Sequence, residues 1–145
     1  MSKVTVGSGI IIINPEGKIL VGKRKGFVPM YSIPGGSFEP GEEFESGAIR
    51  EVKEETDLDI KNPKVIGITN NLETFRKTGK HFMSVILFTN EFTGQPKVME
   101  PEKCEAWAWC DPKQLLQPHF DASLMGVELY LKGKFYIPST ESNSS

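Results

Sequence analysis

Apolar positions in the first part of the chain follow the pattern of β-strands. Val4–Ile13 is rich in β-branched residues and predicts a buried strand, and Ile19–Arg24 predicts a second strand. Between them, Asn14–Gly17 has strong turn chemistry, because asparagine favours the start of a turn and glycine accepts a positive φ. We therefore expect the two strands to pair as a hairpin.

The next segment changes from a loop to a helix. Gly26–Gly41 is interrupted repeatedly by proline and glycine, which predicts a loop with a short strand at Tyr31–Ile33. From Glu42 to about Thr56, apolar residues recur every four positions, at Phe44, Ala48 and Val52. This spacing predicts an amphipathic helix, and the acids at its start suit the positive end of the helix dipole.

The rest of the chain mixes strands with helices. Strands are predicted at Lys64–Asn70, Phe82–Phe92 and Ala106–Cys110, and helices at Asp111–Leu116 and Ala122–Leu131. In the last strand, Trp107 and Trp109 share one face, which is more typical of a core than of a base-stacking platform. Because the elements interleave without regular βαβ repeats, we expect an α+β fold, a mixed sheet covered by helices.

Length and composition exclude several classes of protein. A chain of 145 residues predicts one domain, over residues 1–138, followed by a disordered tail at residues 139–145. A net charge of −2 argues against a protein that binds nucleic acid polymers or membranes through a polybasic surface. The longest apolar stretch is far shorter than the ~20 residues of a membrane span, and the N-terminus lacks a secretory signal pattern. Cys104 and Cys110 fit neither a zinc cluster nor a disulfide framework, so we expect a cytoplasmic protein.

Three carboxylates in the second half of the predicted helix are the first candidates for chemistry. Glu51, Glu54 and Glu55 fall within an arc of about 100° on the helix surface. They repel one another, so a divalent cation such as Mg²⁺, which prefers oxygen ligands, is an obvious partner. A solvated acidic surface would also explain these residues. It would not explain the preceding loop, where Pro34–Gly36 carries so little side chain that the backbone can approach a ligand.

The segment from Gly36 to Leu58, GSFEPGEEFESGAIREVKEETDL, resembles the Nudix box, the signature of Nudix hydrolases. Only Asp57 departs from the pattern, which has glycine there as a left-handed helix cap. Outside the box, LVGKRKG and MEPEKCEAWAW are similar to MutT-type nucleoside triphosphate diphosphatases. The resemblance implies a Nudix-type α/β/α sandwich with a central mixed sheet, dependence on Mg²⁺ or Mn²⁺, and a homodimer.

The resemblance also implies roles for single residues. Metal ligands correspond to Glu51, Glu54, Glu55 and the backbone carbonyl of Gly35, and a late-loop glutamate adds another, for which we choose Glu100 over Glu102 and Glu105. Either Glu54 or Glu51 is the catalytic base, since both lie on the same arc. Arg50 orients these glutamates through charge-assisted hydrogen bonds, and Glu42 is expected to support it.

Substrate contacts follow from the same resemblance. Arg24 matches a position that faces phosphate, and its strand neighbours Lys23 and Lys25 should point to the opposite face. Ser84, Leu124 and Gly126 match positions that line a base pocket, although ordinary strand and helix packing would explain them equally well. His81 and His119 have no metal-like partner in the pattern.

The function we expect is hydrolysis of a nucleoside triphosphate, including oxidised or modified ones, to a nucleoside monophosphate and pyrophosphate. The alternatives are an ADP-ribose, dinucleotide or prenyl-diphosphate pyrophosphatase, and a nucleotide-binding module without catalysis. The charge distribution suits a metal–polyphosphate substrate: residues 39–57 hold eight acids and two bases, so the remaining chain is mildly basic.

Overall fold

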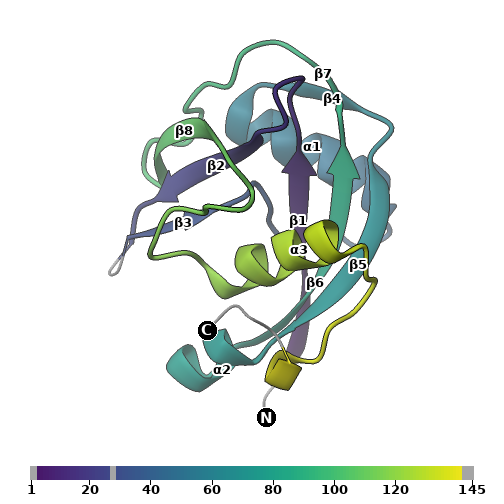
Figure 1. Ribbon diagram of the computed structural model, residues 1–145, viewed down its shortest axis with the longest axis vertical. Coiled ribbons are helices and arrows are strands. Elements are labelled where there is room, and N and C mark those ends of the chain that lie inside the picture. The colour runs from purple at the N-terminus through teal and green to yellow at the C-terminus, as the bar shows by residue number, and fades with distance from the viewer. Residues whose placement is uncertain (1–2, 27–28, 142–145) are drawn as a thin grey trace.

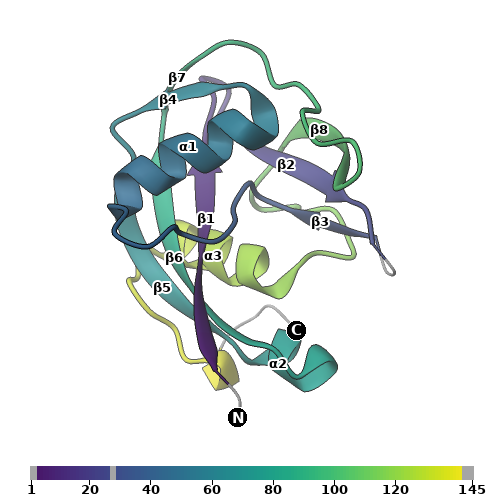
Figure 2. The same cartoon turned by 180° about the vertical axis from the view of Figure 1, so that it is seen from behind.

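A mixed three-stranded sheet is the middle layer of the computed structural model, which describes residues 3–26 and 29–141. Its strands are β1 (Val4–Ile12), β6 (His81–Thr89) and β5 (Lys64–Asn71), in the order β1-β6-β5. β1 runs parallel to β6, and β5 is antiparallel to it. Helix α1 (Phe44–Thr56) covers one face and α3 (Asp121–Lys132) the other (Figures 1 and 2). This arrangement is the predicted α+β sandwich.

The two cores follow from the alternation of side chains along the strands. Ile10 and Ile12 of β1 pack with Val52 of α1 in one cluster, whereas Ile11 packs with Val127 of α3 in the other. All three isoleucines are fully buried, and each such side chain contributes roughly 1.5–3 kcal/mol to folding. A strand buried on both faces has this nearly continuous apolar sequence.

A second three-stranded sheet stands beside the first. It has the order β3-β2-β8, with β2 at Ile19–Arg24, β3 at Met30–Ser32 and β8 at Cys104–Cys110. The expected hairpin of the first two strands is therefore wrong: β1 and β2 belong to different sheets and share only the single bridge Ile13–Ile19. The turn between them exists, but a local turn signal does not say which strands pair, and β1 finds its buried partner in β6.

Several shorter elements differ from the prediction. Strands β4 (Asp59–Lys61) and β7 (Glu91–Thr93) form a small sheet of their own, so the single strand predicted at 82–92 is two strands. Helix α2 (Leu72–Thr78) was not predicted, because none of its residues is buried and it therefore has no apolar period. The helix expected at 111–116 is a turn, in which the Asp111 side chain accepts from the Lys113 backbone at 2.9 Å.

Helix α1, which carries the clustered acids, starts later than predicted and ends at a residue in the left-handed conformation. It was expected from Glu42 but begins at Phe44, so that Glu42 lies outside it. At its other end, Asp57 adopts the left-handed conformation with φ 64°, the position for which the resembled motif has glycine. Ion pairs from Lys53 at 3.2 Å and Lys97 at 3.5 Å compensate for the residue type, and the first of these holds the pKa of Asp57 below its usual value.

The last described residues form a short turn, and neither cysteine forms a disulfide. Ser139–Glu141, the first residues of the predicted tail, form a short 3-10 turn, η1, and the Ser139 hydroxyl donates to the Asn70 carbonyl at 2.8 Å. Residues 142–145 of that predicted tail lie outside the described residues. Cys104 and Cys110 are both free thiols. No helix within the described residues is long and apolar enough to cross a membrane.

Candidate active site

A cleft of about 690 Å³ opens between the two sheets, beside α1 and the start of α3. One end is lined by carboxylates, and basic side chains also contribute to the lining of the cleft. The acidic residues are Glu51, Glu54, Glu55, Glu100 and Glu102, and the basic ones are Arg24, Lys25, Lys80 and Lys103. The other end is lined by small, neutral and aromatic residues, among them Gly7, Asn71, Phe82, Ser84 and Phe120. The volume is within the range of small-molecule sites.

The loop at Pro34–Gly36, called the glycine loop below, is hydrogen-bonded to the edge of β1. The Ser8 backbone N–H donates to the Gly36 carbonyl at 2.7 Å, and the Ser8 hydroxyl donates to the same oxygen at 3.0 Å. A Cβ at Gly35 would collide with the Ser8 carbonyl, and one at Gly36 would collide with the Glu51 carboxylate. Glycine at both positions therefore lets the loop backbone lie directly against the strand and the glutamate.

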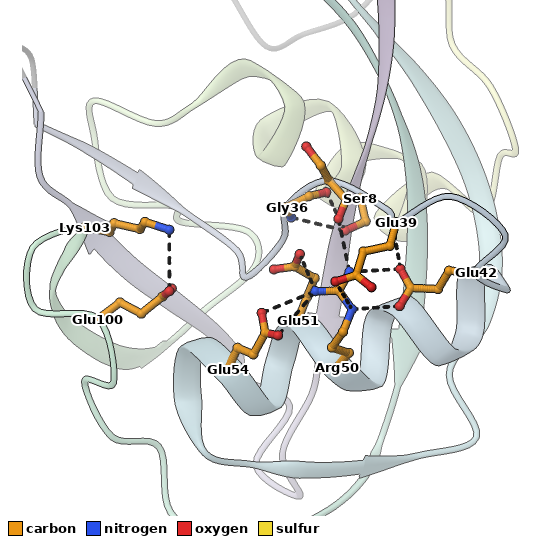
Figure 3. A network of polar contacts seen from close by, with 10 residues as sticks. Ser8, Gly36, Glu39, Glu42, Arg50, Glu51, Glu54, Glu100 and Lys103 are labelled. Atoms are coloured by element: carbon orange, nitrogen blue, oxygen red, sulfur yellow. Dashed lines mark hydrogen bonds and ion pairs between the residues drawn. The ribbon is translucent and has the colours of Figure 1, made fainter.

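Arg50 is the centre of the charge network on α1. Its guanidinium donates twice to Glu42, at 2.7 and 2.9 Å, and also to Glu51 at 3.1 Å and Glu54 at 3.3 Å (Figure 3). The bidentate pair lowers the pKa of Glu42 to about 2 and raises the pKa of Arg50. Arg50 thus makes the contacts expected of a residue that orients the neighbouring glutamates, and Glu42 anchors it.

Glu55 is in the opposite electrostatic situation. Its Oε2 atom is buried and has no hydrogen-bond partner among the described residues. Burial raises the pKa of Glu55, and the nearby charges of Glu51 and Glu100 raise it further. A buried, unpartnered carboxylate oxygen close to two other carboxylates is a donor set that fits a hard divalent cation.

The carboxylates do not yet converge as a metal cage. Within residues 3–26 and 29–141, no three His, Cys, Asp or Glu side chains stand close enough together to hold a metal ion. Figure 3 shows the reason, since Glu51 and Glu54 are both turned toward Arg50. Binding of a cation by these residues together with Glu55 requires rotation of their side chains.

The structure brings most of the predicted site residues into this cleft. Gly35, Glu51, Glu54, Glu55 and Glu100 line it, as do Arg24 and Ser84. Of the other late-loop acids, Glu102 also lines the cleft, whereas Glu105 pairs with Lys23 at 3.4 Å. The charge of Glu100 contributes to the raised pKa of Glu55, so these two carboxylates lie near each other. Arg24 stacks on the Phe120 ring, 4.9 Å from its centroid, and lines the cleft. Lys25 lines it too, contrary to the expected opposite face, because β2 ends at Arg24 and strand alternation does not reach Lys25.

Two predicted substrate contacts are not brought into the lining. Leu124 lies on a separate groove, together with Leu115 and Leu131. Gly126 packs against β6, where a Cβ would lie 2.8 Å from Ile86. Gly126 is therefore surrounded by ordinary helix–strand packing, which was the alternative to a place in the base pocket.

The floor at the neutral end of the cleft is made from the three strands β1, β6 and β5. Gly7 and Ser84 are register partners on β1 and β6, and Phe82 lies on the same face of β6. The Ser84 hydroxyl donates to the Asn71 side chain at 3.0 Å, and Asn71 donates to Thr69 at 3.0 Å. This end therefore combines hydroxyl and amide groups with an aromatic edge and no carboxylate.

Sequence reasoning missed several residues of the site. Ser8 was visible as a polar residue within an apolar strand, but nothing in the pattern linked it to the loop at Gly36. Trp107 and Trp109 do share a face and pack on the core beside α1, as expected. Trp107 also lines the cleft and donates to the Glu55 carbonyl at 3.2 Å, which holds the end of α1. Asn71 and Phe120 carried no signal, because their role depends on distant partners.

Comparison with known proteins agrees with this geometry. Residues 3–126 match the NUDIX domain. The chain is 31% identical over 111 residues to a putative 8-oxo-dGTP diphosphatase of Bacillus subtilis, an alignment that covers 77% of this chain and 69% of that protein. It is 33% identical over 94 residues to an ADP-ribose pyrophosphatase of Methanocaldococcus jannaschii, covering 63% of this chain and 54% of the archaeal protein.

The fold is likewise that of a solved relative. The crystal structure of a MutT NUDIX hydrolase from Burkholderia pseudomallei superposes with a TM-score of 0.79 and 26% identity, covering 88% of this chain and 98% of that one. Members of the family generally use a divalent metal such as Mg²⁺. The match over residues 3–126, with these relatives and this fold, makes the chain a MutT-like member of the Nudix hydrolase family, whose activity is that of a pyrophosphohydrolase.

Proposed function

We propose that this chain hydrolyses nucleoside triphosphates, including oxidised or otherwise modified ones, to a nucleoside monophosphate and pyrophosphate in the presence of Mg²⁺. The carrying observation is that one cleft joins a carboxylate end to a neutral, hydrogen-bonding end. The first suits a polyphosphate with its cation, and the second suits a planar base. The basic residues Arg24 and Lys25 in the lining suit the remaining phosphate charge.

The Mg²⁺ would be held by four carboxylates and one backbone carbonyl, namely those of Glu51, Glu54, Glu55 and Glu100 and that of Gly35. The unpartnered Oε2 of Glu55 supports this choice. When bound, the cation supplies charge neutralisation for the phosphates and lowers the pKa of coordinated water. Mn²⁺ has the same oxygen preference and would serve in its place.

Glu54 is our choice for the base. Its side chain is 53% exposed and its contact with Arg50 is 3.3 Å, whereas Glu51 is 13% exposed and held at 3.1 Å. The more loosely held carboxylate is free to accept the proton of a water that attacks phosphorus. The P–O bond between the α- and β-phosphates breaks, and the monophosphate and pyrophosphate leave. Before a cation binds, Arg50 holds both glutamates beside the cleft.

An ADP-ribose pyrophosphatase is the second candidate, because the archaeal relative has that name. Its substrate carries the same diphosphate, so the carboxylate end does not separate the two functions. A prenyl-diphosphate hydrolase is disfavoured because Asn71 and Ser84 would face an apolar chain with polar groups. A binding module without catalysis is disfavoured because all three helix glutamates are present.

A substrate panel with Mg²⁺ tests the proposal. The panel contains dGTP, 8-oxo-dGTP, dCTP, ADP-ribose, NADH and geranyl diphosphate, and pyrophosphate and monophosphate release are measured separately. We expect pyrophosphate from the triphosphates. Activity confined to ADP-ribose or NADH would replace the leading proposal with the second one. The single domain at 1–138, the homodimer and the cytoplasmic location stay predictions, and sedimentation of the purified protein tests the dimer.

A further inference from the structure

Helix α2 is a wall of the cleft with little support of its own. Thr74 and Thr78 from this helix line the cleft, yet none of its residues is buried. Figures 1 and 2 show it protruding at the end of the central sheet, next to the start of β6. A helix of 7 residues is too short to be stable in isolation, so its position must come from contacts with other elements.

The strongest of those contacts runs to the first residue of α3. The carboxylate of Asp121 accepts from the Thr74 backbone N–H at 3.0 Å and from the Thr74 hydroxyl. It also accepts from the Ala122 backbone N–H at 2.8 Å. Asp121 is 8% exposed, so these hydrogen bonds to a charged group are largely shielded from water. A ring contact between Phe75 and His81, with centroids 5.4 Å apart, adds a weaker support.

This contact lies beside the cleft. Thr74 of α2 lines the cleft, and so do Ala122 and Ser123 of α3, which directly follow Asp121. Ser123 is itself fixed, because its hydroxyl accepts from the Ile33 backbone N–H at 2.9 Å. The start of α3 is therefore anchored to the rest of the fold, and the hydrogen bonds between Asp121 and Thr74 tie α2 to it.

We propose that Asp121 is a positioning residue for substrate selection, and that its pair with Thr74 fixes the width of the cleft where the group attached to the diphosphate binds. Identification of that group as a nucleoside base rests on the proposed function. With the pair intact, α2 stays close and the floor at Asn71 and Ser84 accepts a flat group of limited size. With the pair broken, α2 moves away and larger or smaller groups bind with similar affinity.

The test compares two variants at one position, T74V and T74S, in the full chain. Valine has the shape of threonine without its hydroxyl donor, whereas serine keeps the donor. Backbone hydrogen exchange at residues 72–78 measures the opening of α2 without any substrate. Steady-state rates with dGTP and dCTP measure KM, kcat and the ratio of kcat/KM between the two bases. D121N, which keeps the shape of the side chain and removes its charge, is the second variant.

We expect exchange in α2 to be about tenfold faster in T74V and D121N, the effect of one lost hydrogen bond to a charged group. KM should rise about three- to tenfold with kcat within about twofold, and the dGTP/dCTP ratio should move toward one. T74S should stay close to the wild type. Unchanged exchange, or faster exchange with unchanged KM and base ratio, overturns the proposal. If the wild type hydrolyses neither triphosphate, the proposed function fails, and ADP-ribose affinity by calorimetry, with the exchange data, then decides the role of Asp121.

Discussion

The two ends of the cleft are held in opposite ways. At the carboxylate end, Arg50 binds Glu42, Glu51 and Glu54, of which the last two line the cleft, and the glycine loop is fixed to β1. At the neutral end, uncharged groups such as Asn71 and Ser84 line the cleft, and the charge that holds α2, Asp121, is not part of the lining. The ion pairs with Arg50 keep Glu51 and Glu54 on the face of α1 that lines the cleft, and binding of a cation then needs only rotation of these side chains. Selection of the attached group needs shape, which a buried support provides without adding charge to the lining.

The largest expected effect is at the carboxylate end. E54Q and E51Q should each lower kcat by about 10²–10⁴-fold with a small change in KM, because an amide cannot accept the proton or bind the cation as strongly. Steady-state kinetics with Mg²⁺ measures this, and circular dichroism checks that the variants fold. E45Q is the matched control, since Glu45 is an exposed acid on the same helix outside the cleft. Folded variants with full turnover would remove both glutamates from the mechanism.

A smaller effect separates Glu55 from its neighbours. Because its pKa is raised, the folded state binds the Glu55 proton more tightly than the unfolded state, so metal-free stability falls as pH rises above the ordinary carboxyl range. E55Q removes this cost and should stabilise the metal-free protein by about 1–3 kcal/mol at pH 7. Mg²⁺ should then stabilise the wild type more than E55Q.

Denaturant unfolding of the wild type and of E55Q, each with EDTA and with Mg²⁺, measures the four free energies of unfolding that this prediction compares. E45Q again serves as the control, and it should follow the wild type under both conditions. A metal-free E55Q that is less stable than the wild type would mean that the carboxylate is satisfied within the fold, contrary to its unpartnered oxygen.

A third prediction concerns the neutral end, where His119 supports Ser123. Burial lowers the pKa of His119, and its ring nitrogen lies 2.6 Å from the Ser123 hydroxyl. The unfolded state therefore binds the proton more tightly, so stability is complete above the ordinary histidine pKa of 6.5 and is lost as pH falls below it. H119Q should reduce this loss between about pH 6.5 and 5 by about 1 kcal/mol. Urea unfolding across this range measures it, and parallel stability curves for the two proteins would contradict it.

The smallest expected effect lies at the end of α1, outside the cleft. Asp57 has φ 64°, where glycine is the least strained residue. D57A keeps the strained backbone and loses the ion pairs with Lys53 and Lys97, whereas D57G loses the same pairs and relieves the strain. Thermal unfolding should therefore give D57A a midpoint a few degrees below that of D57G. Equal midpoints would show that the left-handed cap does not limit the stability of this helix.

The carboxylate end was largely predictable because it is local in sequence. The glutamates near the end of α1 occur within one helix, so helical spacing alone predicts that Glu51, Glu54 and Glu55 share a face. Glu42 lies just before that helix, and the role of Gly35 was implied by the resemblance of the same short segment to the Nudix box. The neutral end was not predictable in this way. Its residues come from four separate elements, and sequence spacing does not give the distance in space between them; they are Gly7, Asn71, Ser84 and Ser123.

Strand pairing shows the same limit at the level of the fold. The apolar run at 4–13 correctly predicted a strand whose end is buried on both faces, and the run at 82–92 predicted β6 but not the break before β7. The turn at 14–17 suggested a hairpin, yet each residue of β1 pairs in parallel with the residue of β6 that lies 77 positions later. Such non-local pairing is decided by how whole strand faces fit together. Helix α2 escaped prediction because its contact with Asp121, and not an apolar period, holds it.

Residue types and their spacing along the chain were therefore sufficient to predict the α+β class, the acidic helix and its preference for a cation. These properties depend on hydrophobic periodicity and on charge, both of which are determined by residues close together in the sequence. Only the folded chain decided that Glu55 keeps an unpartnered oxygen, that Ser8 holds the glycine loop and that Asp121 supports α2. Each of these depends on burial or on a hydrogen bond between distant segments, and such contacts exist only after the two sheets and α3 have come together.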